Sequence, residues 1–334
     1  GKAPAAVGAD GMRVARGREL YEGHGAAISR CRFSPDGANI ASASTDGTVR
    51  IWAPSGPDHR AAWGGQARNA TIKCSGEVLS LAWDPRGNKL LLLGTGGGAV
   101  RAWHADTKRV VCDVSPSAGG RVVDIACSPA EPLFLSSAAC PGPAGEVGRL
   151  DVWSMRTFKQ VHALPTGAGF GPPPVAHSLA FNHNGKMVAA ACADGWVRVI
   201  DLASRKAIME WHAHPTGEAR HVRFAPDQNS VFSLGTDGRL IEWSLRSEGL
   251  ADVVDAAALC GGAEACKEFA LDPQGRYGVF SSAGAEALIA DLHTGGQVAR
   301  LGGHAAGVSS VDWHPLLGVC VTGSQDHTVA LSVL

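Results

Sequence analysis

The sequence lacks an excess of charge of either sign. Its 334 residues include 30 Lys and Arg against 31 Asp and Glu, which gives a formal net charge of -1. Proteins that bind nucleic acid or other polyanions depend on clustered positive charge. The composition therefore provides no electrostatic argument for such a partner.

Long apolar runs are also absent. The apolar run at residues 90–93 is far shorter than the ~18 residues that suggest a membrane-spanning helix, and residues 1–10 contain no apolar core of a signal peptide. We therefore expect a soluble, non-secreted chain without direct membrane insertion. Because it begins with Gly rather than Met, we also expect a domain of a longer protein.

The cysteines form an odd set without C-x-x-C spacing, which favours free thiols in a reducing compartment. Cys260 and Cys266, on a predicted loop, are the one pair worth testing for oxidation. The nine positions are Cys31, Cys74, Cys112, Cys127, Cys140, Cys192, Cys260, Cys266 and Cys320.

Signatures of catalysis are missing as well. The sequence contains no G-x-S-x-G, no H-E-x-x-H and no paired-carboxylate spacing. We therefore predict a protein that is not an enzyme and that uses no cofactor and no metal.

Residues 23–52 contain three short strand-like runs separated by two turn signals. The first turn is Ser34-Pro35-Asp36-Gly37 and the second is Thr45-Asp46-Gly47. Short runs between Asp-Gly turns predict antiparallel strands joined by hairpins. The rest of the chain repeats this unit.

Seven such units follow one another along the chain, with third strands predicted to end at Trp52, Trp103, Trp153, Asp201, Trp243, Asp291 and Ser332. Their spacing of roughly 41 to 51 residues is near the length of one propeller blade. The Gly-His, Ser-Pro-Asp-Gly and Asp-Gly-x-Val-Arg-Ile-Trp signatures resemble the WD-repeat family over essentially the whole chain. This resemblance implies an all-β fold, a seven-bladed WD-repeat β-propeller.

The predicted organisation is a disordered lead-in at residues 1–17 and one propeller domain at residues 18–334. In this fold class the first strand, here residues 18–21, pairs with the last blade near residues 329–333. Such closure removes the exposed edges that make open sheets aggregate.

In WD repeats, a His, a Ser or Thr, an Asp and a Trp form a buried hydrogen-bonded set, and the resemblance implies such sets in blades one, five and seven. A catalytic Ser-His-Asp interpretation is disfavoured because the pattern recurs by blade and the Trp would cover the Ser. The residues are His24, Ser42 or Ser44, Asp46 and Trp52; His214, Ser233, Asp237 and Trp243; and His304, Thr322 or Ser324, and Asp326.

Three other patterns have competing interpretations. The Gly-rich residues 94–98 resemble a phosphate-binding loop, but a strand rather than a helix is predicted to follow. The H-x-H pair His212 and His214, with His221 after the next turn, could bind a metal, although His214 already belongs to a buried set. The third-strand arginines could form a basic ring for an acidic partner, but packing along the neighbouring blade is favoured; they are Arg50, Arg101, Arg198 and Arg239.

Partner contacts are predicted on one rim of the ring, where loops vary while the blades hold their positions. The residue before each hairpin Asp should lie there, beside the channel. These residues are Thr45, Ala193, Thr236 and Gln325.

Eight longer stretches resemble, more specifically, the C-terminal propeller of one WD-repeat subfamily of endosomal trafficking factors. This resemblance implies a non-catalytic scaffold in the cytoplasm, peripheral on early and late endosomes through its partners. It implies a role in early-to-late endosome conversion, binding of the active late-endosomal Rab GTPase, restraint of the class III phosphatidylinositol 3-kinase complex, and action beside a BEACH-domain WD-repeat protein. The stretches are residues 69–74, 77–84, 108–113, 127–132, 181–186, 232–238, 242–245 and 311–315.

Two alternatives remain open. Cullin ubiquitin-ligase receptors of the WD-repeat family often carry Trp-Asp-x-Arg after the third strand. This chain keeps the Arg at Trp153-Ser-Met-Arg156 and Trp243-Ser-Leu-Arg246 but has Ser in place of Asp. A generic WD-repeat scaffold is the other alternative.

Overall fold

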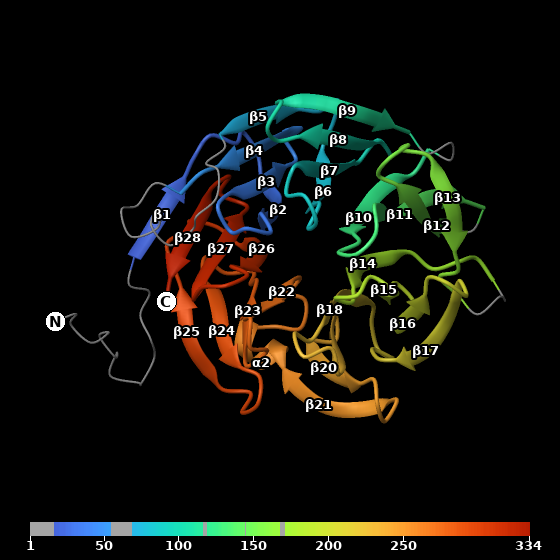
Figure 1. The fold of residues 1–334 in the computed structure, drawn as a ribbon. Coiled ribbons are helices and arrows are strands. Elements are labelled where there is room, and N and C mark those ends of the chain that lie inside the picture. Colours follow the sequence, from blue (N-terminus) through green and yellow to red (C-terminus); the bar gives the residue numbers. More distant parts are fainter. Residues whose placement is uncertain (1–16, 55–68, 116–118, 144, 168–170) are drawn as a thin grey trace.

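In the computed structural model the strands form seven four-stranded antiparallel sheets arranged as blades around a central channel (Figure 1). The structure describes residues 17–54, 69–115, 119–143, 145–167 and 171–334. The predicted disordered lead-in lies outside these residues, apart from Gly17, which begins the first strand.

Each blade has one strand facing the channel, two middle strands and one outer strand. The inner strands are β2 (Ile28–Phe33), β6 (Val78–Trp83), β10 (Arg121–Cys127), β14 (Ala176–Phe181), β18 (Ala219–Phe224), β22 (Phe269–Leu271) and β26 (Val308–Trp313). The second strands are β3 (Ile40–Ser44), β7 (Leu90–Thr95), β11 (Leu133–Gly142), β15 (Met187–Cys192), β19 (Ser230–Gly235), β23 (Tyr277–Phe280) and β27 (Val319–Ser324). The third strands are β4 (Thr48–Trp52), β8 (Val100–His104), β12 (Gly145–Ser154), β16 (Trp196–Asp201), β20 (Arg239–Ser244), β24 (Ala287–Asp291) and β28 (Val329–Val333). The outer strands are β5 (Ala70–Lys73), β9 (Arg109–Val114), β13 (Gln160–Leu164), β17 (Lys206–His212), β21 (Gly249–Asp255), β25 (Gln297–Leu301) and β1 (Gly17–Tyr21).

The ring closes between its two ends, as predicted. Strand β1 pairs antiparallel with β28, in a register that places Gly17 opposite Val333 and Tyr21 opposite Val329. The seventh blade therefore takes its outer strand from the beginning of the chain and its other three strands from the end (Figure 1).

Small residues in the second strands follow from their position in the blade. All five residues of β3, Ile-Ala-Ser-Ala-Ser, are buried. The second strand has sheet neighbours on both sides and adjacent blades on both faces, and in β3 this leaves no side chain exposed to water. One core cluster shows this packing between blades, since Val49 and Ile51 of the first blade join Leu81, Trp83 and Leu91 of the second.

Blades three and six differ in detail from the predicted pattern. In blade three the β11–β12 hairpin is longer than the corresponding hairpin of the other blades and stays paired as far as Gly142 opposite Gly145. In blade six, Cys260 lies in the short helix α2 (Ala256–Cys260), where a loop was predicted. Cys260 and Cys266 are both buried free thiols in the core, so they are not exposed to oxidants as the loop prediction implied.

No helix within the described residues is long and apolar enough to cross a bilayer.

Candidate functional site

The predicted His-Ser-Asp-Trp set of the first blade is brought together in space. His24 Nε2 lies 2.7 Å from Ser42 Oγ, and the Trp52 indole N–H donates to the same hydroxyl at 2.8 Å. Ser44 is not part of this set, because its hydroxyl donates to the Ala26 carbonyl at 3.0 Å. The set thus joins the segment before β2 to strands β3 and β4.

The same arrangement occurs in blades five and seven. His214 lies 3.1 Å from Ser233 Oγ, which also accepts the Trp243 indole N–H at 3.1 Å. In blade seven, where Ser332 stands at the third-strand position of the Trp, His304 Nε2 lies 2.7 Å from Thr322 Oγ1. Ser324 instead donates to the Ala306 carbonyl at 3.0 Å.

Sequence reasoning missed a threonine that stands between the His and the Asp. In blade one, His24 Nδ1 lies 2.9 Å from Thr48 Oγ1 but 3.4 Å from Asp46. Thr48 in turn donates to Asp46 at 2.6 Å.

Thr328 holds the same position in blade seven, 2.9 Å from His304 and 2.6 Å from Asp326. Blade five has Arg239 at this position, and there His214 contacts Asp237 directly at 2.9 Å. The signal that could have revealed the role was a Thr two residues after the Asp.

The protonation states agree with a structural network. Burial lowers the pKa of His24, His214 and His304 despite their Asp partners, so these rings are neutral at pH 7. Burial alone would raise the pKa of Asp46, but hydrogen bonds from Thr48 and from the Gly25 backbone lower it to about 2. The pKa of Asp326 is lowered to about 2 in the same way, so the sets of blades one and seven each hold a neutral imidazole near a carboxylate whose pKa is about 2.

The serine hydroxyls have no route to a substrate. Ser42 and Ser233 are both completely buried, and a Trp and a His occupy each hydroxyl. A nucleophile must reach a reacting atom, so this geometry disfavours the catalytic interpretation. The Ser, His and Asp side chains instead link the strands of a blade.

Replacing Ser42 with Ala should lower the free energy of unfolding by about 1–3 kcal/mol for each buried partner left unsatisfied, here His24 and Trp52. Urea denaturation measures the change. Ser247→Ala, at an exposed turn position, is the matched control and should shift stability by no more than about 0.5 kcal/mol. Equal effects of the two substitutions would contradict the role given to Ser42.

The four predicted rim residues share one backbone arrangement. Each begins the turn after a second strand. Its backbone N–H donates to the carbonyl of the residue immediately before an inner strand. This places the four positions together on one face of the ring, beside the channel. The bonds are Thr45 to Ala27, Ala193 to Val175, Thr236 to Glu218 and Gln325 to Gly307. Gln325 is exposed and the other three are half-buried.

A charged cluster, which the sequence did not reveal, fills the channel. Glu268 is completely buried. It forms an ion pair with Arg30 at 3.1 Å and another with Arg32. His221 lies 3.4 Å from it, and the Val311 backbone N–H donates to it at 3.2 Å.

The ionisation of this cluster follows from its contacts. Burial by itself would raise the pKa of Glu268, but Arg32, Arg30 and His221 together hold it well below its usual value. Burial and the nearby Arg223 lower the pKa of His221 to about 3, although Glu268 opposes this shift. A charged glutamate thus lies between two arginines, beside a neutral histidine.

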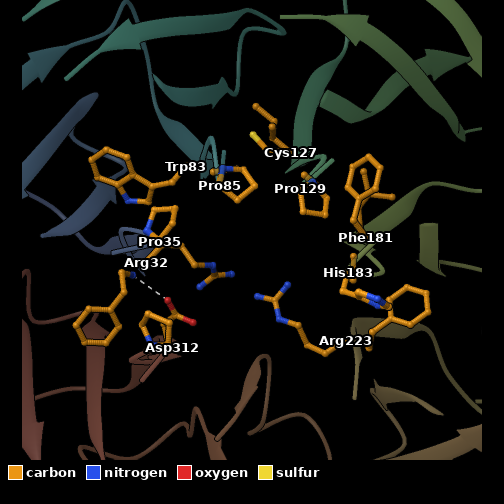
Figure 2. Close-up of a pocket in the computed structure, with 18 of the residues that line it drawn as sticks. Arg32, Pro35, Trp83, Pro85, Cys127, Pro129, Phe181, His183, Arg223 and Asp312 are labelled. Carbon is orange, nitrogen blue, oxygen red and sulfur yellow. Dashed lines mark hydrogen bonds between the residues drawn. The ribbon is translucent and has the colours of Figure 1, made fainter. Parts of the chain in front are cut away.

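The face opposite the rim residues is hollowed at the channel mouth (Figure 2). A cavity of about 480 Å³ opens there, lined by turn residues and strand ends of several blades. Arg32 and Arg223 project into its centre, and Asp312 lies beside Arg32. Figure 2 also shows Trp83, Pro35, Pro85, Pro129 and Phe181 around the edge.

The histidines considered as metal ligands have separate partners. His212 stacks on Trp196 at 5.0 Å, His214 belongs to its buried set, and His221 faces Glu268. The described part of the chain contains no group of three or more His, Cys, Asp or Glu residues arranged to hold a metal ion.

The Gly-rich residues 94–98 comprise the end of β7 and the turn that leads to β8. A Cβ at Gly98, whose φ is +85°, would lie 2.0 Å from the Gly120 carbonyl oxygen. A larger residue at Gly98 would therefore clash with the next blade. Strand β8 follows the turn, so no helix N-terminus is available there to bind a phosphate.

The third-strand arginines have different surroundings. Arg101 reaches the neighbouring blade, where it donates to the Lys73 carbonyl at 2.8 Å. Arg198 forms ion pairs with Asp194 and Glu210 of its own blade. Arg50 lies over the indole of Trp52, and Arg239 is exposed.

The two arginines of the ubiquitin-ligase alternative, Arg156 and Arg246, are exposed in turns after the third strands of their blades.

Comparison with known proteins identifies the class. Residues 17–53, 171–201 and 295–331 match the WD40 family, described as WD domain, G-beta repeat. Together with seven four-stranded blades in a closed ring, this match shows that the chain is a WD-repeat β-propeller and belongs to the WD-repeat family.

Within that family the chain is similar to WD repeat-containing protein 91. It is 31% identical to the Pongo abelii protein over 96% of the chain, and 32% identical to the Danio rerio protein over 98%. A homolog from Dictyostelium discoideum is 31% identical over 95%. The chain spans 49%, 48% and 40% of these relatives, or about half their length.

Proposed function

We propose that this propeller is a docking platform in early-to-late endosome conversion, held on endosomes through its partners. In this proposal it binds the active late-endosomal Rab GTPase, restrains the class III phosphatidylinositol 3-kinase complex and works with a BEACH-domain WD-repeat protein. The supporting observation is the similarity to WD repeat-containing protein 91, which extends over 95–98% of the chain rather than over isolated repeats.

The rim beside the channel is the proposed contact surface for the GTPase. Backbone hydrogen bonds hold its turns to the residues that precede the inner strands. The turns are therefore already ordered before a partner binds. Ordering a loop on binding costs free energy, and a preformed surface avoids that cost.

The direct test is binding of the GTP-loaded and GDP-loaded GTPase to this chain by isothermal titration calorimetry. The GTP form should bind, and Thr236→Arg should weaken binding at least tenfold, or about 1.4 kcal/mol, because a long charged side chain would stand in the interface. Thr107→Arg, exposed in the β8–β9 turn on the opposite face, is the matched control and should bind as the unmodified chain does. Absence of binding by the unmodified chain would refute a GTPase contact in this domain.

A further inference from the structure

The channel mouth on the face opposite the rim is framed by rigid, apolar residues. Pro35, Pro85, Pro129 and Pro315 each belong to a different blade and each line the cavity. Proline has no N–H and a fixed φ, so these positions provide shape but no hydrogen-bond donor. Any charged group of a ligand at this channel mouth must therefore be bound by the side chains at its centre.

Two guanidinium groups meet at that centre (Figure 2). Arg32 is already engaged, since it pairs with Glu268 and donates to the Cys31 carbonyl at 2.8 Å. Arg223 differs, because its guanidinium has no hydrogen-bond or ion-pair partner among the residues that the structure describes. Its guanidinium lies in the cavity, where it can donate to a bound acceptor (Figure 2).

The nearest carboxylates are committed elsewhere. Asp312 accepts the Phe33 backbone N–H at 2.8 Å, and Asp124 accepts the Leu179 backbone N–H at 2.8 Å. These bonds tie neighbouring inner strands together. Both carboxylates offset part of the positive charge, but neither forms an ion pair with Arg223.

Arg223 is therefore held in an unfavourable environment. Burial and the like charge of Arg32 lower its pKa. Arg223 is half-buried, and a partly buried charge without an ion-pair partner is less stable than a paired one, so a bound anion would stabilise it. A carboxylate suits a guanidinium particularly well, because two parallel N–H···O bonds can form.

The cavity's size and lining indicate what carries that carboxylate. A volume of about 480 Å³ is within the range of small-ligand sites. It accommodates a few side chains and not a folded domain. The rings of Phe33, Trp83, Phe181 and Trp313 line it and offer apolar contact to the residues on either side of an acidic one.

We propose that this mouth binds a short acidic peptide segment of a partner protein, with an Asp or Glu carboxylate paired to Arg223 and apolar neighbours against the aromatic rings. The site lies on the face opposite the proposed GTPase contact and does not depend on it. The two proposals can therefore fail separately.

The test uses fluorescein-labelled heptapeptide pools with a central Glu, Asp, Gln, Asn or phosphoserine and random flanks. Peptides retained on the immobilised chain are sequenced. The affinity of the most tightly bound Glu-centred peptide is then compared, by fluorescence anisotropy, with that of the same peptide carrying Gln in place of Glu. The Glu peptide should bind at least tenfold more tightly, and Arg223→Gln should abolish that preference. Arg246→Gln, which removes an exposed arginine from a turn on the same face, should leave it unchanged.

Equal binding of the Glu and Gln peptides, or a preference that survives Arg223→Gln, would overturn the proposal. So would binding of the phosphoserine pool alone. If the Arg223→Gln variant does not fold, the unmodified chain is tested by photocrosslinking. The Glu peptide then carries a benzophenone residue next to its Glu, and the crosslinked residues of the chain are identified. Crosslinks to Phe33, Trp83, Phe181 or Trp313 would support the site, and crosslinks to the rim face would contradict it.

Discussion

Replacing Glu268 with Gln should lower the free energy of unfolding by about 3–5 kcal/mol. This is the usual cost of removing one partner of a buried ion pair. Glu268 is completely buried and is the carboxylate shared by Arg30 and Arg32. Gln keeps the shape but not the charge, so both guanidinium groups would lose their shared carboxylate, and Arg30 would keep only the longer contact with Asp124 at 4.0 Å. Urea denaturation followed by tryptophan fluorescence measures the change.

The matched control is Glu146→Gln. Glu146 pairs with Arg121 at 2.9 Å, but about half of each side chain is exposed, 53% and 48% respectively. Such surface pairs contribute about 0–1 kcal/mol, so this variant should unfold near the same urea concentration as the unmodified chain. Similar losses in both variants would show that the channel cluster has no special role in stability.

Removing residues 1–21 should destabilise the ring and cause self-association. The deletion takes away β1, leaving β28 as an open edge with unpaired backbone groups. Open edges pair with other chains. It also removes the half-buried Tyr21 ring, whose centroid lies 5.4 Å from that of the Trp52 ring. Full burial of a large apolar side chain contributes about 1.5–3 kcal/mol, so the loss of this ring should cost less than about 3 kcal/mol.

Light scattering and urea denaturation provide the readouts for this deletion. Removing only residues 1–16 keeps β1 and is the control, so that chain should stay monodisperse at the same protein concentration. A truncated chain lacking residues 1–21 that remained monomeric and equally stable would contradict closure by β1.

Much of the fold could be predicted because its signals are local. Each hairpin turn lies within a few residues of the strands it joins, and the third strands end within one residue of the predicted Trp52, Trp103, Trp153, Asp201, Trp243, Asp291 and Ser332. The pairs of His with Ser or Thr could also be predicted, because they recur at similar separations in blades one, five and seven.

The channel could not be predicted in the same way. Glu268 and Arg32 are 236 residues apart and belong to different blades, so no repeat places them together. Alternation in β2 does put Arg30 and Arg32 on the face opposite Cys31 and Phe33, but it does not name their partner. In the same way, the cavity at Arg223 is formed by turns of several blades whose convergence only the closed ring creates.

Native-state hydrogen exchange of the intact chain, measured at increasing urea concentrations, tests the closed ring most directly. If β1 closes the ring, the amides of residues 17–21 and 329–333 should exchange at similar rates. Their exchange rates should rise with urea concentration as those of the inner-strand amides do, because all of them open in one cooperative event. Exchange of residues 17–21 about a hundredfold faster than that of residues 329–333, without dependence on urea, would contradict the account.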